Sequence, residues 1–375
     1  MRITVIKRLR QRPVWVMLVS SCAFYVLLSV QPALASDRPD VENAVILIYH
    51  NVSDTTPPVT SVSPDTFRRH MQYLEDNGYT VWPLYKTLVY LAGGRKVPPK
   101  TVVITFDDAY RSVYTEAYPV LREKRWPFTV FVTTKYINDE RGHYMSWDQL
   151  REIERAGAQI GNHTVSHPYM IRHRKGENRF RWQDRMTEEI EAAQEKLTDE
   201  GLKPIRVLAY PYGEFSRPLQ DLVAGLGYYA MGQQSGAVSR QSDFQALPRF
   251  PITTGYDSLD DFALKVAAKN LPVQVLAPED GVLDASTDIP ELTLQLHSGP
   301  YDKAGFACYA SGQGKIQLEW LNQSKTVVAV RANEALPPGR SKYNCTAPSK
   351  SDANVYYWFS FLWMKPESNG QWYLE

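Results

Sequence analysis

A chain of 375 residues with 42 basic and 41 acidic side chains carries almost no net charge. This balance excludes a general nucleic-acid binder, which would show a surplus of lysine and arginine. The length exceeds that of one small domain and favours two domains.

The first 35 residues have the pattern of a secretory signal peptide. Five basic residues precede an uncharged apolar segment at residues 14–30, and Ala33-Leu34-Ala35 forms a small-x-small cleavage site. We therefore predict an exported protein, periplasmic or secreted, with 37 basic and 41 acidic residues after cleavage. Two alternatives stay open: an uncleaved membrane anchor through residues 14–30, and a lipoprotein processed at Cys22, because residues 19–22 are similar to a lipobox.

Strand and helix patterns alternate from residue 44 to about residue 270. The first predicted strand, residues 44–50, is apolar and ends in His50. Further strands are predicted at 79–84, 101–106, 128–132, 157–162, 206–209, 228–231 and 250–252. Helices are predicted at 63–77, 86–92, 112–124, from 147, and at 186–200, 218–226 and 258–269.

Strands that alternate with helices pair in parallel, because each helix crosses over a face of the sheet. About six to eight such units can close into a barrel. Their uneven spacing favours a distorted, incomplete (β/α) barrel over a full eightfold one. We predict that this α/β domain occupies residues 40–272.

The pattern changes near residue 273 to short alternating strands separated by turns. We predict a small C-terminal all-β sandwich domain at residues 290–375. Cys308 and Cys345 are the two cysteines that remain after cleavage, and in an exported protein such a pair predicts a disulfide. The aromatic side chains of residues 356–373 suit either a sandwich core or a carbohydrate-binding face, and we interpret most of them as core.

Two adjacent carboxylates, Asp107 and Asp108, follow the uncharged strand at residues 101–106. A strand buried on both faces cannot carry carboxylates without partners, whereas the carboxyl ends of parallel strands hold the catalytic groups of α/β enzymes. Adjacent side chains on a strand point to opposite faces. The chain must therefore turn here if both carboxylates serve one site, with one on a metal and the other free. A plain helix cap is the alternative role.

His163, His167, Tyr212 and His50 also lie at predicted carboxyl ends of strands, and in a barrel these ends share one face. Pro168 disfavours a helix that continues through His167, so we expect the two histidines in a turn. Two neutral imidazoles and one carboxylate make a three-ligand site for a divalent ion, with positions left for water and substrate.

Three segments together resemble the successive motifs of the polysaccharide deacetylases, the NodB-homology carbohydrate esterases of family 4. They are Thr105-Phe106-Asp107-Asp108, His163-Thr164-Val165-Ser166-His167 and Ala209-Tyr210-Pro211-Tyr212-Gly213. The resemblance covers about residues 44–270. Leu47-Ile48-Tyr49-His50 is similar to the rearranged branch that includes the poly-β-1,6-N-acetylglucosamine deacetylases, in which the late histidine motif stands before the Asp-Asp strand.

The resemblance implies a role for each of five side chains. Asp108, His163 and His167 would hold a divalent ion, which we expect to be Zn²⁺, with Co²⁺, Ni²⁺ or Fe²⁺ as alternatives. Asp107 would be the general base and His50 the general acid in the hydrolysis of an acetamide by metal-activated water.

The same resemblance implies a pocket around the acetyl group. The backbone N–H of Tyr212, beside Pro211, would face the oxyanion, and Trp147 would form a wall of the pocket. Ordinary helix packing is the alternative role of Trp147.

Two features depart from the family pattern. Many members carry an arginine that orients the base where this chain has Ala209, and nearby Arg206 is out of register. What positions Asp107 therefore stays open. His297 ends a Leu-Gln-Leu-His segment that copies the late histidine motif of the unrearranged family, and we interpret it as a coincidence within the predicted sandwich.

The predicted function is removal of N-acetyl groups from an N-acetylglucosamine polysaccharide, with a β-1,6-linked exopolysaccharide as the first candidate. The expected partners are this N-acetylated polysaccharide and the machinery that exports it, and no nucleic acid. Chitin oligomers and peptidoglycan are alternative substrates. A non-catalytic carbohydrate-binding protein is the alternative of another class, although pure binding would not need a free carboxylate beside a metal.

Overall fold

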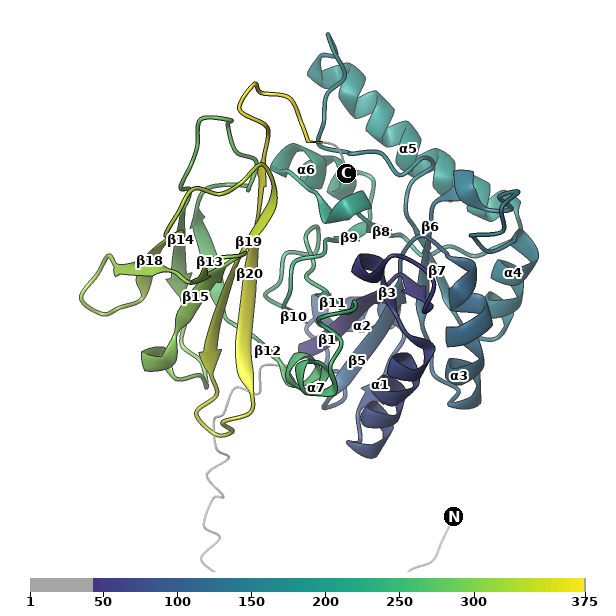
Figure 1. The fold of residues 1–375 in the computed structure, drawn as a ribbon, viewed down its shortest axis with the longest axis horizontal. Helices are drawn as coiled ribbons and strands as arrows, with labels where there is room; N and C mark the ends of the chain where they lie inside the picture. Colours follow the sequence, from purple (N-terminus) through teal and green to yellow (C-terminus); the bar gives the residue numbers. More distant parts are fainter. Residues whose placement is uncertain (1–42, 374–375) are drawn as a thin grey trace, which may run out of the picture. The chain divides into compact units, whose positions relative to one another are not determined.

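The uncharged strand at residues 101–106 lies inside the main sheet of the computed structural model, which describes residues 43–373. In Figure 1, the alternating strands and helices up to about residue 270 run from purple to green, and the later sheets run from green to yellow. The predicted signal peptide at residues 1–35 lies outside the described residues. Within the described range, no helix is long and apolar enough to cross a bilayer.

The main sheet has nine strands, with the order β10-β1-β5-β6-β7-β8-β9, while β11 also pairs with β1 and β4 with β5. Neighbours pair in parallel apart from β10, which runs antiparallel to β1. The strands are β1 Asn43–Tyr49, β4 Thr80–Val81, β5 Thr101–Phe106, β6 Thr129–Val132, β7 Gln159–Asn162, β8 Val207–Ala209, β9 Tyr229–Met231, β10 Ala237–Ser239 and β11 Phe250–Pro251. This curled sheet confirms the predicted distorted, incomplete barrel.

Seven α-helices accompany these strands in the described part of the chain. They are α1 Pro64–Asp76, α2 Leu84–Ala92, α3 Tyr118–Glu123, α4 Trp147–Arg155, α5 Arg179–Asp199, α6 Arg217–Gly225 and α7 Leu259–Ala267. Short segments complete this half: strands β2 Asn51–Val52 and β3 Ser61–Val62, and helical turns η1 Pro58–Thr60, η3 Thr134–Tyr136 and η4 Pro211–Gly213.

Two helices differ from the sequence-based expectation. Helix α5 begins at Arg179 rather than Met186, because the side chain of Asn178 accepts a hydrogen bond from the Arg181 N–H and caps an earlier turn. The helix expected at 112–124 starts as a π-helical segment, η2 (Val113–Ala117). Pro119, the second residue of α3, has no N–H to bond the carbonyl one turn earlier, which favours such irregular geometry.

The chain beyond α7 forms two sheets around their own core, and their strands pair antiparallel apart from β12, which runs parallel to β20. One has the order β12-β20-β19-β15-β16 and the other β13-β14-β18-β17. Their strands are β12 Lys269–Asn270, β13 Val273–Ala277, β14 Glu291–Leu296, β15 Ala307–Ala310, β16 Gly314–Lys315, β17 Gln317–Trp320, β18 Val327–Arg331, β19 Gly339–Pro348 and β20 Tyr356–Lys365, with the turn η5 Lys303–Gly305. Strands β12 and β13 precede residue 290, where we expected the sandwich to begin. The difference arises because β13 pairs with β14 across the segment that precedes Pro290.

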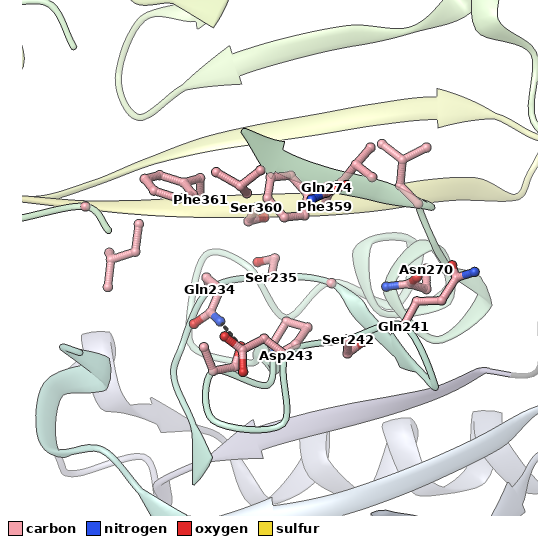
Figure 2. Close-up of a pocket in the computed structure, with 18 of the residues that line it drawn as sticks. Gln234, Ser235, Gln241, Ser242, Asp243, Asn270, Gln274, Phe359, Ser360 and Phe361 are labelled. Atoms are coloured by element: carbon pink, nitrogen blue, oxygen red, sulfur yellow. Dashed lines mark hydrogen bonds between the residues drawn. The ribbon is translucent and has the colours of Figure 1, made fainter. Parts of the chain in front are cut away.

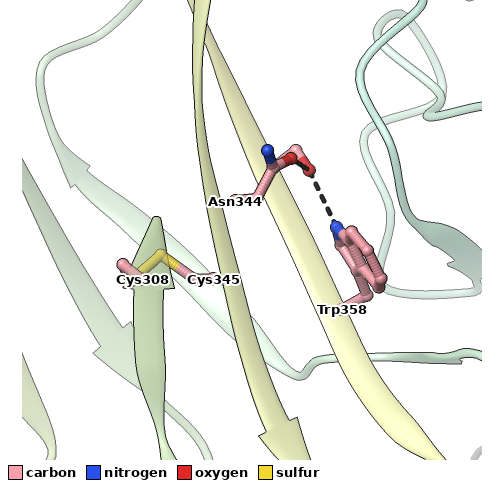
Figure 3. Close-up of a disulfide and its surroundings, with 5 residues drawn as sticks. Cys308, Asn344, Cys345 and Trp358 are labelled. Carbon is pink, nitrogen blue, oxygen red and sulfur yellow. Dashed lines mark hydrogen bonds between the residues drawn. A yellow bond between two sulfur atoms is a disulfide. The ribbon is translucent and has the colours of Figure 1, made fainter. Parts of the chain in front are cut away.

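Cys308 and Cys345 form a disulfide between neighbouring strands β15 and β19, as predicted (Figure 3). Trp358, on β20, donates its indole N–H to the hydroxyl of Ser360 at 3.1 Å, and its ring meets that of Phe250 on β11 edge-on. The two halves belong to one compact unit. The sandwich therefore contacts the barrel through aromatic side chains as well as through the chain connection.

Candidate active site

The chain turns directly after β5, as one shared site for the two carboxylates requires. Asp108 and Ala109 have φ of 70° and 58°, in the left-handed region that non-glycine residues rarely adopt. This turn directs Asp107 toward Arg249 and Asp108 toward the two histidines. Asp107 and Asp108 are adjacent in the sequence, yet Asp107 bonds Arg249 and Asp108 contacts the histidines.

Asp108, His163 and His167 form a cluster with the ligand geometry of a metal site. The candidate ligand atoms of the three residues lie within 4.8 Å of one another. Asp108 Oδ1 lies 3.3 Å from His163 Nε2 and 3.4 Å from His167 Nε2. These three residues come from the ends of β5 and β7, so parallel pairing of the sheet brings the ligands together.

The tautomer of His163 suits metal binding. Its Nδ1 lies 2.7 Å from the carbonyl oxygen of Ala209, which only accepts, so Nδ1 carries the proton and Nε2 can offer its lone pair. Burial, with a smaller effect from His163, lowers the pKa of His167 to about 4, so that ring is neutral near pH 7. Burial would raise the pKa of Asp108, but without a metal the hydrogen bond and charge of a protonated His163 outweigh it and lower that pKa, and a bound cation would take the place of this proton on Nε2. The donor set therefore fits a divalent cation.

Asp107 is held by a buried arginine that the sequence reading did not identify. Arg249 Nη1 and Nη2 donate to Asp107 Oδ1 and Oδ2 at 2.7 and 2.8 Å, and both side chains are fully buried. Burial alone would raise the pKa of Asp107, but the Arg249 charge outweighs it and lowers this pKa. The ionised form that a general base needs is thereby favoured, while lone pairs remain free on each oxygen.

Arg249, and not Arg206, is the arginine that orients Asp107. The Arg206 guanidinium instead donates to Glu191 and to the Leu226 carbonyl. Arg249 directly precedes β11, which pairs with β1 beside β5, so it reaches Asp107 from 142 residues away. The available sequence signal was its isolation, since it is the one charged residue between positions 244 and 256.

His50 follows β1 and adjoins this site. Its charge interacts with Asp107, Asp108 and His167. Its Nδ1 is buried and has no hydrogen-bond partner among the described residues. His50 thus lies within electrostatic range of both carboxylates, and its role as general acid stays a prediction.

The Pro211–Gly213 turn, η4, follows β8 and lies against the histidines. Tyr212 has φ of 60°, and its ring meets His167 edge-on with centroids 4.5 Å apart. Gly213 also has positive φ, and an added Cβ would lie 2.8 Å from Gln233, so this close approach requires glycine. Pro211 is buried in the turn.

Other aromatic side chains lie near the cluster or behind it. Tyr110 stacks on Tyr144, which stacks on Tyr136, and both Tyr110 and Tyr144 interact with the charge of Asp108. Trp147 is 8% exposed in the hydrophobic core, with the Lys196 ammonium 5.5 Å from its ring. These contacts of Trp147 are those of a packing residue, and its role in an acetyl pocket stays a prediction.

His297 lies in a different part of the molecule. It follows β14 of the sandwich and lines a cavity of about 570 Å³. Figure 2 shows this cavity between Ser235 and Gln241 on one side and Ser360, on β20, on the other. The two histidine candidates for the general acid are therefore in separate places, and His50 is the one that adjoins the carboxylates.

The sequence and the fold of this chain are similar to those of known proteins. Residues 94–231 match the Polysaccharide deacetylase family. YxkH of Bacillus subtilis (strain 168) is 29% identical over 212 residues, covering 56% of this chain and 71% of YxkH. The poly-beta-1,6-N-acetyl-D-glucosamine N-deacetylase of Escherichia coli (strain K12) is 24% identical over 283 residues, covering 66% of this chain and 41% of that protein. The structure of IcaB from Ammonifex degensii is 26% identical with a TM-score of 0.52, covering 59% of this chain and 96% of that one.

Proposed function

We propose that this chain contains a polysaccharide deacetylase domain and is a metal-dependent hydrolase that removes N-acetyl groups from poly-β-1,6-N-acetylglucosamine. The observation that carries the proposal is the convergence of Asp108, His163 and His167 beside Asp107, which Arg249 holds ionised. A carbohydrate-binding protein would have no use for a buried, oriented carboxylate next to a cation site.

Each residue has a step that its position allows. A divalent ion at Asp108, His163 and His167 would polarise the acetamide carbonyl and make water more acidic. Asp107 accepts the proton of the attacking water, with its carboxylate kept in place by the two Arg249 hydrogen bonds.

The remaining steps concern the oxyanion and the leaving amine. The backbone N–H of Tyr212 would donate to the developing negative charge, from a turn that forms before the reaction begins. His50 donates a proton to the departing nitrogen, and acetate and a glucosamine unit leave. The ligand set accepts Zn²⁺, Co²⁺, Ni²⁺ or Fe²⁺, and Zn²⁺ is our proposal.

The choice of polymer rests on the names of the relatives. The match to the E. coli enzyme covers 41% of that protein's length. The direct test is to measure acetate released from three substrates: N-acetylated β-1,6-glucosamine oligomers, chitin oligomers and peptidoglycan fragments. We expect the β-1,6 oligomers to have the highest kcat/KM. Faster release from chitin or peptidoglycan would change the substrate and keep the chemistry. Binding to any of them without acetate release would favour the non-catalytic alternative.

His50→Ala should lower kcat by about 10²–10⁴-fold and leave bound metal unchanged, because it removes a proton donor and no ligand. His297→Ala is the matched control, since that histidine lies on the sandwich, and it should change neither quantity. Turnover and metal content per protein are measured together. Normal turnover of His50→Ala with loss in His297→Ala would reverse the assignment.

We also propose that the protein is exported, periplasmic or secreted, and that it acts with the machinery that exports the polysaccharide. The Cys308–Cys345 disulfide supports export, because such bonds persist in oxidising compartments. Cell fractionation of the full chain tests this proposal, and recovery of the protein in the cytoplasm with reduced cysteines would contradict it.

A further inference from the structure

A buried carboxylate, Glu214, lies directly after the turn that carries Tyr212. It is fully buried, and among the described contacts one of its oxygens, Oε1, accepts from Arg172, Arg340 and Tyr373. Arg172 Nη2 and Arg340 Nη1 each lie 3.4 Å from it, and the hydroxyl of Tyr373 donates to it as well. Arg172 comes from the barrel, whereas Arg340 lies in β19 and Tyr373 follows β20. The sandwich half thus supplies two of the three donors.

A second set of contacts connects the same residues to a predicted metal ligand. The ring of Tyr212 meets His167 edge-on, and Tyr169 stacks on Tyr212 with centroids 3.9 Å apart. The Arg172 guanidinium lies 3.3 Å from the centre of the Tyr169 ring and donates to the Tyr373 carbonyl at 2.6 Å. Two contacts therefore hold Tyr212 in place. Glu214 anchors the backbone that follows its turn, and Tyr169 stacks on its ring.

The Arg340 guanidinium also lies 5.7 Å from the centre of the Tyr212 ring. A strained turn with positive φ at Tyr212 and Gly213 persists only if its surroundings hold it. The described contacts of Glu214 include two from the sandwich half, so both halves contribute to the surroundings of the turn.

We propose that Arg340 and Tyr373, acting through Glu214, are positioning residues that hold the Tyr212 turn in its catalytic geometry, so that the C-terminal sandwich completes the active site. This inference rests on the proposed deacetylase function. It assigns the sandwich a role in turnover, separate from any role in carbohydrate binding. Neither residue touches the reacting atoms. Their effect is expected in kcat, because displacement of a catalytic donor by a fraction of an ångström slows the chemical step.

Arg340→Met and Tyr373→Phe test this proposal in the full chain. Each should lower kcat for acetate release about tenfold, with KM and bound metal within twofold of the unchanged protein. The double variant should be less impaired than the product of the two single effects, because both act on one carboxylate. Arg340→Lys, which keeps the charge, should recover part of the loss. Arg331→Met and Tyr309→Phe are the controls, since Arg331 pairs with Glu291 and Glu319 on the other sheet and Tyr309 is exposed.

A purely structural role would lower the melting temperature and leave kcat per folded, metal-loaded molecule unchanged. Tyr373→Phe removes only a hydroxyl, so we expect it to fold and to test the inference even if Arg340→Met folds poorly. A kcat within twofold of the unchanged protein in both variants would overturn the inference, as would a fall in kcat matched by equal loss of metal. Failure of the unchanged protein to release acetate from any polymer would instead overturn the proposed function.

Discussion

Removal of the divalent ion should reduce acetate release by about a thousandfold or more. Polarisation of a carbonyl by a bound cation contributes several kcal/mol, and each 1.4 kcal/mol changes a rate about tenfold. The test is a strong chelator followed by dialysis, with acetate release and metal content measured before and after addition of Zn²⁺. Restored turnover is expected with about one ion per chain.

Variants of the three proposed ligands make this test specific to the site. His163→Ala and Asp108→Ala should lower metal content as well as turnover, because each removes one of three donors. His173→Ala is a matched control, since that ring stacks on Trp182 instead. Full turnover by metal-free protein, or unchanged metal content in His163→Ala, would contradict the assignment.

Arg249→Met should lower the free energy of unfolding by about 3–5 kcal/mol at pH 7, because it leaves the Asp107 carboxylate buried without its paired charge. The pKa of Asp107 is lowered in the folded protein. The ionised pair therefore contributes its full stability above the unfolded pKa of about 3.9, and this contribution is lost as the pH falls through the folded pKa. Denaturant unfolding at pH 7 measures the change.

A second substitution separates stability from catalysis at this pair. Arg249→Met combined with Asp107→Asn should be more stable than Arg249→Met alone, because no buried charge is left unpaired. The double variant should still have lost about 10²–10⁴-fold in turnover, since the base is absent. Arg206→Met is the control, because Arg206 is about half exposed and bonds Glu191. Wild-type stability of Arg249→Met would show that the pair is not needed for the fold.

The sequence alone was sufficient for features that depend on local patterns. The run of strands and helices, the carboxylates after β5 and the His163–His167 spacing all follow from periodicity and from polar residues at strand ends. The parallel order of such strands then brings the three ligands together without further information. The pairing of Cys308 with Cys345 could also be predicted, because only two cysteines follow the predicted signal peptide.

The tertiary structure decided which distant segments support these residues. Arg249 reaches Asp107 across 142 positions, and it precedes a strand of only two residues, which carries almost no periodic signal. The partners of Glu214 could not be predicted either. A buried carboxylate requires hydrogen-bond donors, but its sequence neighbours do not indicate that Arg340 and Tyr373 of the sandwich half supply them. The early start of the sandwich likewise depends on the pairing of β13 with β14 across a Pro-rich loop. Local chemistry therefore determined which groups could react, and long-range packing determined what holds them in place.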